Sequence, residues 1–204
     1  MKISLQDAGK RFNREWIFRH INYEFSAGVK YAVTGANGSG KSTLLQVIAG
    51  ATLQSEGKVI FTNLNNSGEL SDPYKKLSLA APYLELIEEM TATEFLSFHS
   101  KFKPLSKDAD FILREMELAT SASKQIRYFS SGMKQRLKLA QAFFSETPVL
   151  LLDEPTTNLD ANGITLYHAL IEKYTTNRLV IVSSNDQQEY GFCEKVIKIE
   201  DYKT

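Results

Sequence analysis

The chain has 204 residues, enough for one α/β domain with a hydrophobic core. Its 24 basic and 24 acidic residues cancel, which excludes a strong overall field for attracting nucleic acid, so we expect no nucleic-acid partner. The only cysteine, Cys193, excludes an intrachain disulfide, and the longest aliphatic runs are far shorter than the roughly 20 residues that span a bilayer.

The first part of the chain has the alternation that is typical of strands. Apolar and polar residues alternate over residues 3–6 and 21–25, which predicts half-exposed antiparallel strands. A short strand over residues 30–34 is expected to lead into a glycine-rich loop. The apolar residues within 42–49 predict a buried helix after that loop, and a further strand is expected over residues 58–62.

The middle of the chain changes character. Residues 63–72 are polar and predict a loop, whereas apolar residues recur at helical spacing from Thr91 onward. We therefore predict a helical insertion over about residues 83–128, with an α/β core formed by residues 1–82 and 129–204.

The last third alternates helices with apolar strands. Helices are predicted over residues 131–145 and 164–174, continuous apolar strands over 149–152 and 179–182, and an edge strand over 195–199. Strands that are apolar throughout and alternate with helices indicate a mostly parallel sheet covered on both faces. The predicted fold is thus α/β, with a parallel core, an N-terminal antiparallel β subdomain and an inserted α-helical subdomain.

The glycine-rich loop matches the phosphate-binding P-loop in full. Its glycines let successive backbone N–H groups point at phosphate oxygens, and the helix after it adds its positive N-terminus. The lysine would reach the β- and γ-phosphates, and the following serine hydroxyl would bind Mg²⁺. An ordinary glycine-rich turn is the alternative, which the position between a strand and a helix disfavours. The predicted ATP-binding residues are Gly35, Ala36, Asn37, Gly38, Ser39, Gly40, Lys41, Ser42 and Thr43.

An acidic pair follows the apolar strand over residues 149–152. Ligands of α/β proteins bind at the carboxyl ends of parallel strands, so this strand delivers Asp153 and Glu154 to the expected ligand edge. Asp153 would hold Mg²⁺ with Ser42, and Glu154 could polarise an attacking water. Alone, such a strand could simply lead into a solvated turn.

Four motifs together resemble the ATP-binding cassette (ABC) family over nearly the whole chain. They are the P-loop, the acidic pair within Asp153-Glu154-Pro155-Thr156, the Ser130-Ser131-Gly132 segment that resembles the family signature, and Asp160 in a segment that resembles its D-loop. Ser130 is also a good N-cap for the helix that follows. The resemblance implies that Ser130, Ser131 and Gly132 act in trans, on ATP held by a second ABC subunit, with which the chain would form a homodimer or heterodimer.

The resemblance also implies the remaining parts of the site and its setting. An aromatic residue should stack on adenine, and Phe12 fits that place, with Trp16 as the alternative or a purely structural role for Phe12. The chain would hydrolyse ATP with Mg²⁺ and power a separate transmembrane permease. It would then be cytoplasmic and peripheral at the inner face of the cell membrane, with Phe95, Phe98 and Phe102 lining a permease groove or merely forming the insertion's core.

Three motifs depart from the family. Asn185 stands where a histidine usually contacts the γ-phosphate, and Pro82 stands where the Q-loop glutamine is expected. Ser131 and Met133 also replace the usual glycine and glutamine of the signature. Because Asn cannot become cationic, we expect binding to survive and hydrolysis by Glu154, Lys41 and Asn185 to be slow unless a partner compensates. A soluble ABC ATPase with an assembly role and a weakly hydrolysing ATP sensor remain the alternative functions.

Overall fold

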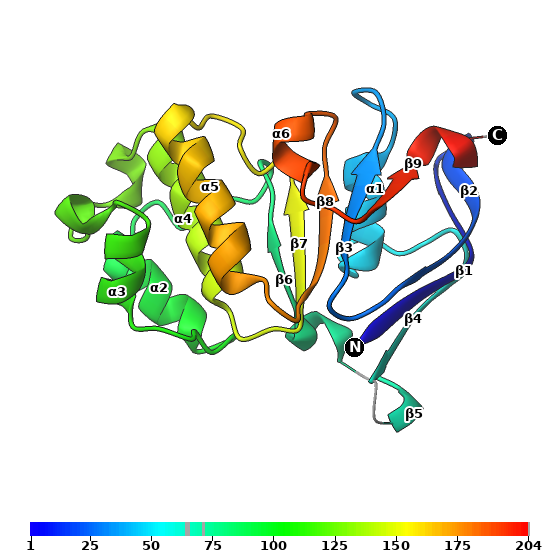
Figure 1. The fold of residues 1–204 in the computed structure, drawn as a ribbon, viewed down its shortest axis with the longest axis horizontal. Coiled ribbons are helices and arrows are strands. Elements are labelled where there is room, and N and C mark those ends of the chain that lie inside the picture. The colour runs from blue at the N-terminus through cyan, green and yellow to red at the C-terminus, as the bar shows by residue number, and fades with distance from the viewer. Residues whose placement is uncertain (64–65, 71, 204) are drawn as a thin grey trace.

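The computed structural model describes residues 1–63, 66–70 and 72–203 and contains two β-sheets with flanking helices (Figure 1). One sheet is antiparallel with the order β2-β1-β4-β5, and the other is parallel with the order β6-β7-β8-β3-β9. This confirms the predicted α/β fold. The strands are β1 (Lys2–Phe12), β2 (Glu15–Phe25), β3 (Lys30–Thr34), β4 (Glu56–Asn63), β5 (Asn66–Glu69), β6 (Leu77–Ala80), β7 (Val149–Asp153), β8 (Leu179–Ser183) and β9 (Lys195–Lys198).

The helices gather mainly on one side of the parallel sheet, where α2 to α5 form the left-hand part of Figure 1. Helix α1 instead lies beside β3, between the two sheets. The α-helices are α1 (Lys41–Ile48), α2 (Ala92–Ser100), α3 (Ala109–Glu115), α4 (Ser131–Phe144), α5 (Ala161–Tyr174) and α6 (Gln187–Tyr190).

The central strands are buried because helices or the second sheet cover both faces. Every residue of β7 and β8 is buried. Along β7, Leu150 and Leu152 pack into the core shared with α4 and α5, whereas Val149 and Leu151 pack into the core shared with α1 and the antiparallel sheet. Each face of the parallel sheet therefore has its own hydrophobic core, as the continuous apolar strands predict.

The antiparallel sheet buries one face and exposes the other. Ile3 and Leu5 on β1 and Ile21 and Phe25 on β2 are buried, which confirms the alternation in the sequence. This packing places β2 across the beginning of α1, where Ile17 lies against the glycine-rich loop.

The helical segment between β6 and α4 has well-defined helix starts. Thr91 caps α2 in a capping box with Glu94, and Asp108 caps α3. Phe95 is 6% exposed and belongs to the core, so of its two expected roles the structure favours the one in the core of the insertion. Phe98, near the C-terminal end of α2, and Phe102, just beyond it, remain exposed at 37% and 68%.

Two strands differ from the sequence prediction. The polar residues 63–72 include β5, which pairs with β4, and the part of that predicted loop at 64, 65 and 71 lies outside the described residues. Strand β6 was not predicted, because it is only Leu77–Ala80 long and its neighbours gave no alternation. It pairs with β7, and this pairing brings residues 81–83 to the carboxyl edge of the parallel sheet.

Candidate nucleotide-binding site

The glycine-rich loop lies at the carboxyl end of β3, where the parallel sheet presents its ligand edge. Gly38 and Gly40 have φ values of 75° and 107°, a backbone region that favours glycine. A Cβ atom on Gly40 would also collide with the Ile17 side chain. A hollow of about 190 Å³ opens here, lined by Ile17, Asn37, Gly38, Ser39, Gly40, Lys41, Ser42, Thr43 and Glu154. The backbone thus curls around a space bounded by the N-terminus of α1.

Lys41 is held over this loop. Its side chain is almost buried, and Nζ donates to the carbonyl oxygens of Gly35 at 2.8 Å and Ala36 at 3.1 Å. The ammonium therefore already lies in the hollow, where an anionic ligand would meet both a fixed positive charge and backbone N–H groups.

Asp153 ends β7 and faces the first turn of α1. It is 1% exposed, and its Oδ1 accepts a hydrogen bond from the Ser183 hydroxyl at 2.6 Å. Burial raises the pKa of Asp153, while hydrogen bonds from Ser183 and Ser42 act in the opposite direction. The carboxylate and the Ser42 hydroxyl therefore meet, and together they are the hard oxygen donors that Mg²⁺ prefers.

Glu154 and Asn185 approach the same loop from β7 and β8. Glu154 lines the hollow, has a left-handed φ of 41°, and donates its backbone N–H to the Ser183 carbonyl at 2.9 Å. The Asn185 side chain donates from Nδ2 to Oδ1 of Asn37 at 3.2 Å. The residue in the usual histidine position is thus in contact with the P-loop itself.

The segment after β6 brings a tyrosine to this edge. The side chain of Pro82 has no polar group. Its carbonyl oxygen accepts a hydrogen bond from Lys138 Nζ at 2.6 Å, which connects this backbone segment to α4. Tyr83 lies next to it. Burial raises the pKa of Tyr83 to about 12, the charge of Asp153 adds to the rise, and a hydrogen bond with Gln46 opposes it. A phenol therefore lies near Asp153 where the sequence suggested no polar side chain.

The signature segment forms a different hollow, of about 420 Å³. Ser130 is the N-cap of α4, and its Oγ accepts from the Met133 N–H at 3.2 Å. Asp160 caps α5 through Gly163 and lies 3.5 Å from an Arg136 nitrogen. The hollow is lined by Ser130, Ser131, Gly132, Met133, Arg136, Asn158, Leu159 and Asp160. The described residues therefore present two separate hollows that share no lining residue.

The two candidate adenine platforms differ in what covers their rings. Trp16 carries the Arg19 guanidinium 4.4 Å from its ring and the Arg11 guanidinium 5.4 Å away. Phe12 is 48% exposed and has only the Lys10 ammonium over it, at 4.8 Å. The geometry favours Phe12, because a flexible lysine leaves a ring more easily than an arginine that is also paired with Glu56.

Several residues of this region escaped the sequence analysis. Ile17 lines the hollow, Ser183 bonds Asp153, and the Glu200 carboxylate accepts from the Ala36 N–H at 2.7 Å. Ser183 could have been found, since it is the first polar residue after an apolar strand. Ile17 and Glu200 carry no such signal, because long-range packing alone brings them to the loop.

Comparisons with known proteins agree on one family. Residues 18–157 match the family model described as ABC transporter. The chain is 29% identical to the uncharacterized ABC transporter ATP-binding protein YybJ of Bacillus subtilis, over 97% of this chain and 92% of that protein. It is 30% identical to the cytochrome c biogenesis ATP-binding export protein CcmA of Rhizobium etli, over 92% and 89% of the two chains. A solved ATP-binding subunit of an ABC transporter superposes with a TM-score of 0.81 at 23% identity over 98% and 86% of the chains, a likeness that concerns the fold.

Proposed function

The chain belongs to the ATP-binding cassette (ABC) family, and from this premise we propose that it is the ATP-hydrolysing subunit of a transporter whose membrane-spanning part is a separate chain. The observation that carries the proposal is the convergence of Lys41, Ser42 and Glu154 on one hollow at the carboxyl edge of the parallel sheet, with the buried Asp153 beside Ser42. Among the described residues, no helix is long and apolar enough to cross a membrane.

The P-loop would hold the phosphates of ATP. The backbone N–H groups of residues 38–43 and the Lys41 ammonium bind the β- and γ-phosphates, and Phe12 stacks on adenine. Ser42 and Asp153 would hold Mg²⁺, which would offset the negative charge of the phosphates. Asp153 is buried, and the hydrogen bond that its carboxylate accepts from Ser183 fixes its orientation.

Glu154 is the proposed general base. It orients a water for attack on the γ-phosphorus and accepts a proton from it, while the bond from that phosphorus to the bridging oxygen breaks and ADP leaves. Asn185 can donate a hydrogen bond near the γ-phosphate from its position beside Asn37. As a neutral amide it stabilises developing negative charge less than an imidazolium would, which favours slow hydrolysis.

A second ABC subunit would complete the site. The signature hollow faces a different region from the P-loop hollow, so one chain offers two half-sites. In a head-to-tail pair, the N-terminus of α4, with Ser130 and Gly132, would cover the γ-phosphate held by the partner's P-loop. The partner is a second copy of this chain or a related chain.

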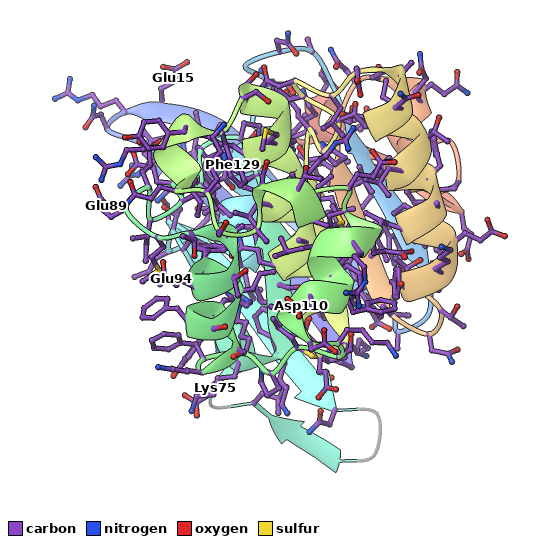
Figure 2. All side chains as sticks on the ribbon, turned by 90° about the vertical axis from the view of Figure 1, so that its left-hand side faces the viewer. Glu15, Lys75, Glu89, Glu94, Asp110 and Phe129 are labelled. Carbon is purple, nitrogen blue, oxygen red and sulfur yellow. The ribbon has the colours of Figure 1, made fainter. Side chains whose placement is uncertain are left out.

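A surface beside α2 would receive the permease. A hollow of about 360 Å³ lies between the end of α1, β6 and α2, with Leu77, Leu79, Leu84 and His99 in its lining. Nearby Phe98 and Phe102 are exposed, with ring centroids 5.0 Å apart. Figure 2 faces this helical side, on which Glu89 and Glu94 lie along the same edge. Such exposed apolar surface is typical of an interaction site, here for a cytoplasmic helix of a membrane subunit.

Steady-state ATP hydrolysis by the Glu154→Gln variant tests the enzymatic part. We expect hydrolysis to fall by roughly 10²–10⁴-fold while ATP binding persists, because only the general base is removed. Chromatography with ATP should then show accumulation of a dimer. Glu146→Gln, an exposed glutamate, is the matched control. Undiminished hydrolysis in Glu154→Gln would rule out the proposed role.

Sedimentation with native membranes tests the permease surface. The doubly substituted Phe98→Ser, Phe102→Ser chain should lose association with membranes that contain its transporter. Val196→Ser provides the control, since Val196 is 53% exposed on β9, at the edge of the parallel sheet opposite β6. Equal association of all three proteins would place the permease contact elsewhere.

A further inference from the structure

A buried carboxylate behind the nucleotide hollow is bonded to the turn that carries Glu154. Glu189 lies on α6 and is only 3% exposed. Its Oε1 accepts hydrogen bonds from the Thr156 backbone N–H at 2.7 Å and from the Thr156 hydroxyl at 2.5 Å. A buried carboxylate needs such donors, since an unpaired buried charge is costly. The Glu189 carboxylate is therefore hydrogen-bonded to Thr156, which lies two positions after the proposed general base.

The same turn is held from its other side by the signature helix. Gln135, on the first turns of α4, is 3% exposed, and its Nε2 donates to the Pro155 carbonyl at 2.8 Å. Pro155 and Thr156 are thus bonded to side chains from two different helices. One of these helices, α4, has Ser130 as its N-cap, and the other, α6, begins two residues after Asn185.

The hydrogen bonds of Glu189 with Thr156 and of Gln135 with Pro155 are together called the clamp. The backbone conformation of Glu154 gives a reason for it. Its φ of 41° is unusual for a residue with a side chain and costs about 1–3 kcal/mol, so it persists only where the surroundings impose it. The N–H of Glu154 is fixed by the Ser183 carbonyl on the strand side. On the turn side, the Glu154 carbonyl accepts from the Thr157 N–H at 3.2 Å, and the hydrogen bonds of Gln135 with Pro155 and of Glu189 with Thr156 hold the next two residues.

Glu189 is itself firmly placed. Its backbone N–H donates to the Asp186 carbonyl at 3.0 Å, and its carbonyl accepts from the Tyr167 hydroxyl at 2.7 Å. Tyr167 is completely buried on α5. The short helix α6 is therefore fastened to α5, and a rotation of Glu189 away from Thr156 would break buried hydrogen bonds.

We propose that Glu189, opposed by Gln135, is a positioning residue that holds Glu154 in its left-handed conformation and so directs its carboxylate into the nucleotide hollow. The inference rests on the proposed function of Glu154 as general base. It adds that the turn Pro155–Thr156 couples the signature helix and the segment of Asn185 to that base, so these three parts of the molecule keep a fixed relation.

Hydrogen exchange tests the clamp without reference to activity. Glu189→Ala and the milder Thr156→Val, which removes the hydroxyl but keeps the N–H, should speed exchange of the amides of residues 153–160 several-fold. Glu189→Gln keeps both acceptor bonds and should resemble wild type. Thr165→Val is the matched control, because it removes an exposed hydroxyl bond to Ala161 on α5. Unchanged exchange in this segment in Thr156→Val would overturn the proposal.

Kinetics test whether the clamp acts through Glu154. In the full chain, Thr156→Val and Glu189→Ala should lower kcat by roughly 10-fold or more with little change in KM, since a small misplacement of a catalytic group is costly. In a Glu154→Gln background the same substitutions should cause no further loss. Equal losses in both backgrounds would overturn a positioning role. Absence of hydrolysis in wild type would instead refute the proposed function, while the exchange comparison would still decide on the clamp.

Discussion

The P-loop hollow and the signature hollow are built in contrasting ways. The P-loop hollow, about 190 Å³, lies where parallel strands end, and left-handed glycines and a buried lysine shape it. The signature hollow, about 420 Å³, lies at two capped helix starts, those of α4 and α5. The first contains the charges needed to hold a triphosphate and a metal. The second offers N–H groups but no comparable cradle, which is expected if it acts on a ligand held elsewhere.

The largest effect should come from the P-loop hollow. Lys41→Ala removes the buried ammonium that Gly35 and Ala36 now hold, so ATP should bind about 100-fold more weakly and hydrolysis should cease. Binding of a fluorescent ATP analogue measures this, with the exposed Lys124→Ala as control. Unaltered affinity in Lys41→Ala would mean that the phosphates bind elsewhere.

The signature hollow should respond differently. In Gly132→Asp, a Cβ would lie 3.0 Å from the Asn158 carbonyl, and the new carboxylate would oppose a γ-phosphate in the partner. Hydrolysis should therefore be lost, whereas ATP affinity of the single chain should stay within about twofold of wild type. Ser123→Asp adds the same charge at an exposed site. If ATP affinity fell as much as hydrolysis, the two hollows would belong to one site in a single chain.

The adenine platform should give a smaller, graded effect. Removal of a stacking ring costs about 1–3 kcal/mol, so Phe12→Ala should weaken ATP binding by roughly 10-fold. Trp16→Ala should weaken it less, because Arg19 and Arg11 already cover that ring. Titration of both variants with ATP and with inorganic triphosphate separates base from phosphate contacts. The reverse ranking would make Trp16 the platform.

Asn185, which follows β8 and contacts the P-loop, gives a further test of how the P-loop hollow works. Asn185→His introduces a side chain that can carry positive charge beside Asn37, so kcat should rise several-fold without a matching change in KM. Asn162→His, at an exposed position on α5, is the control. A lower kcat would show that the amide itself is required.

The smallest effect concerns the surface beside α2. Burial lowers the pKa of His99 to about 4, with a further contribution from Lys103. Between pH 6.5 and about 4, the unfolded chain binds a proton that the folded chain does not, so the free energy of unfolding falls as pH drops. His99→Gln should flatten that fall in denaturant titrations at pH 7 and pH 5. An unchanged slope would contradict burial of the neutral ring.

The sequence predicted most of the fold because strand and loop signals here are local. Continuous apolar residues marked β7 and β8, and the spacing of glycines placed the P-loop between β3 and α1. Strand β6 escaped because four residues are too few for a period. The role of Phe95 stayed open between groove and core, because helical spacing does not tell which face is covered. Tyr83, Glu189 and Glu200 reach the site only through tertiary contacts.

Subunit complementation tests most directly whether the two hollows work in different molecules. Lys41→Ala and Gly132→Asp should each be inactive, but a mixed dimer contains one site with an intact P-loop and an intact signature. Mixing equal amounts should therefore restore about a quarter of the wild-type hydrolysis rate by random pairing. If wild type is active alone and the mixture stays as inactive as its parts, the division of the site between two chains is wrong.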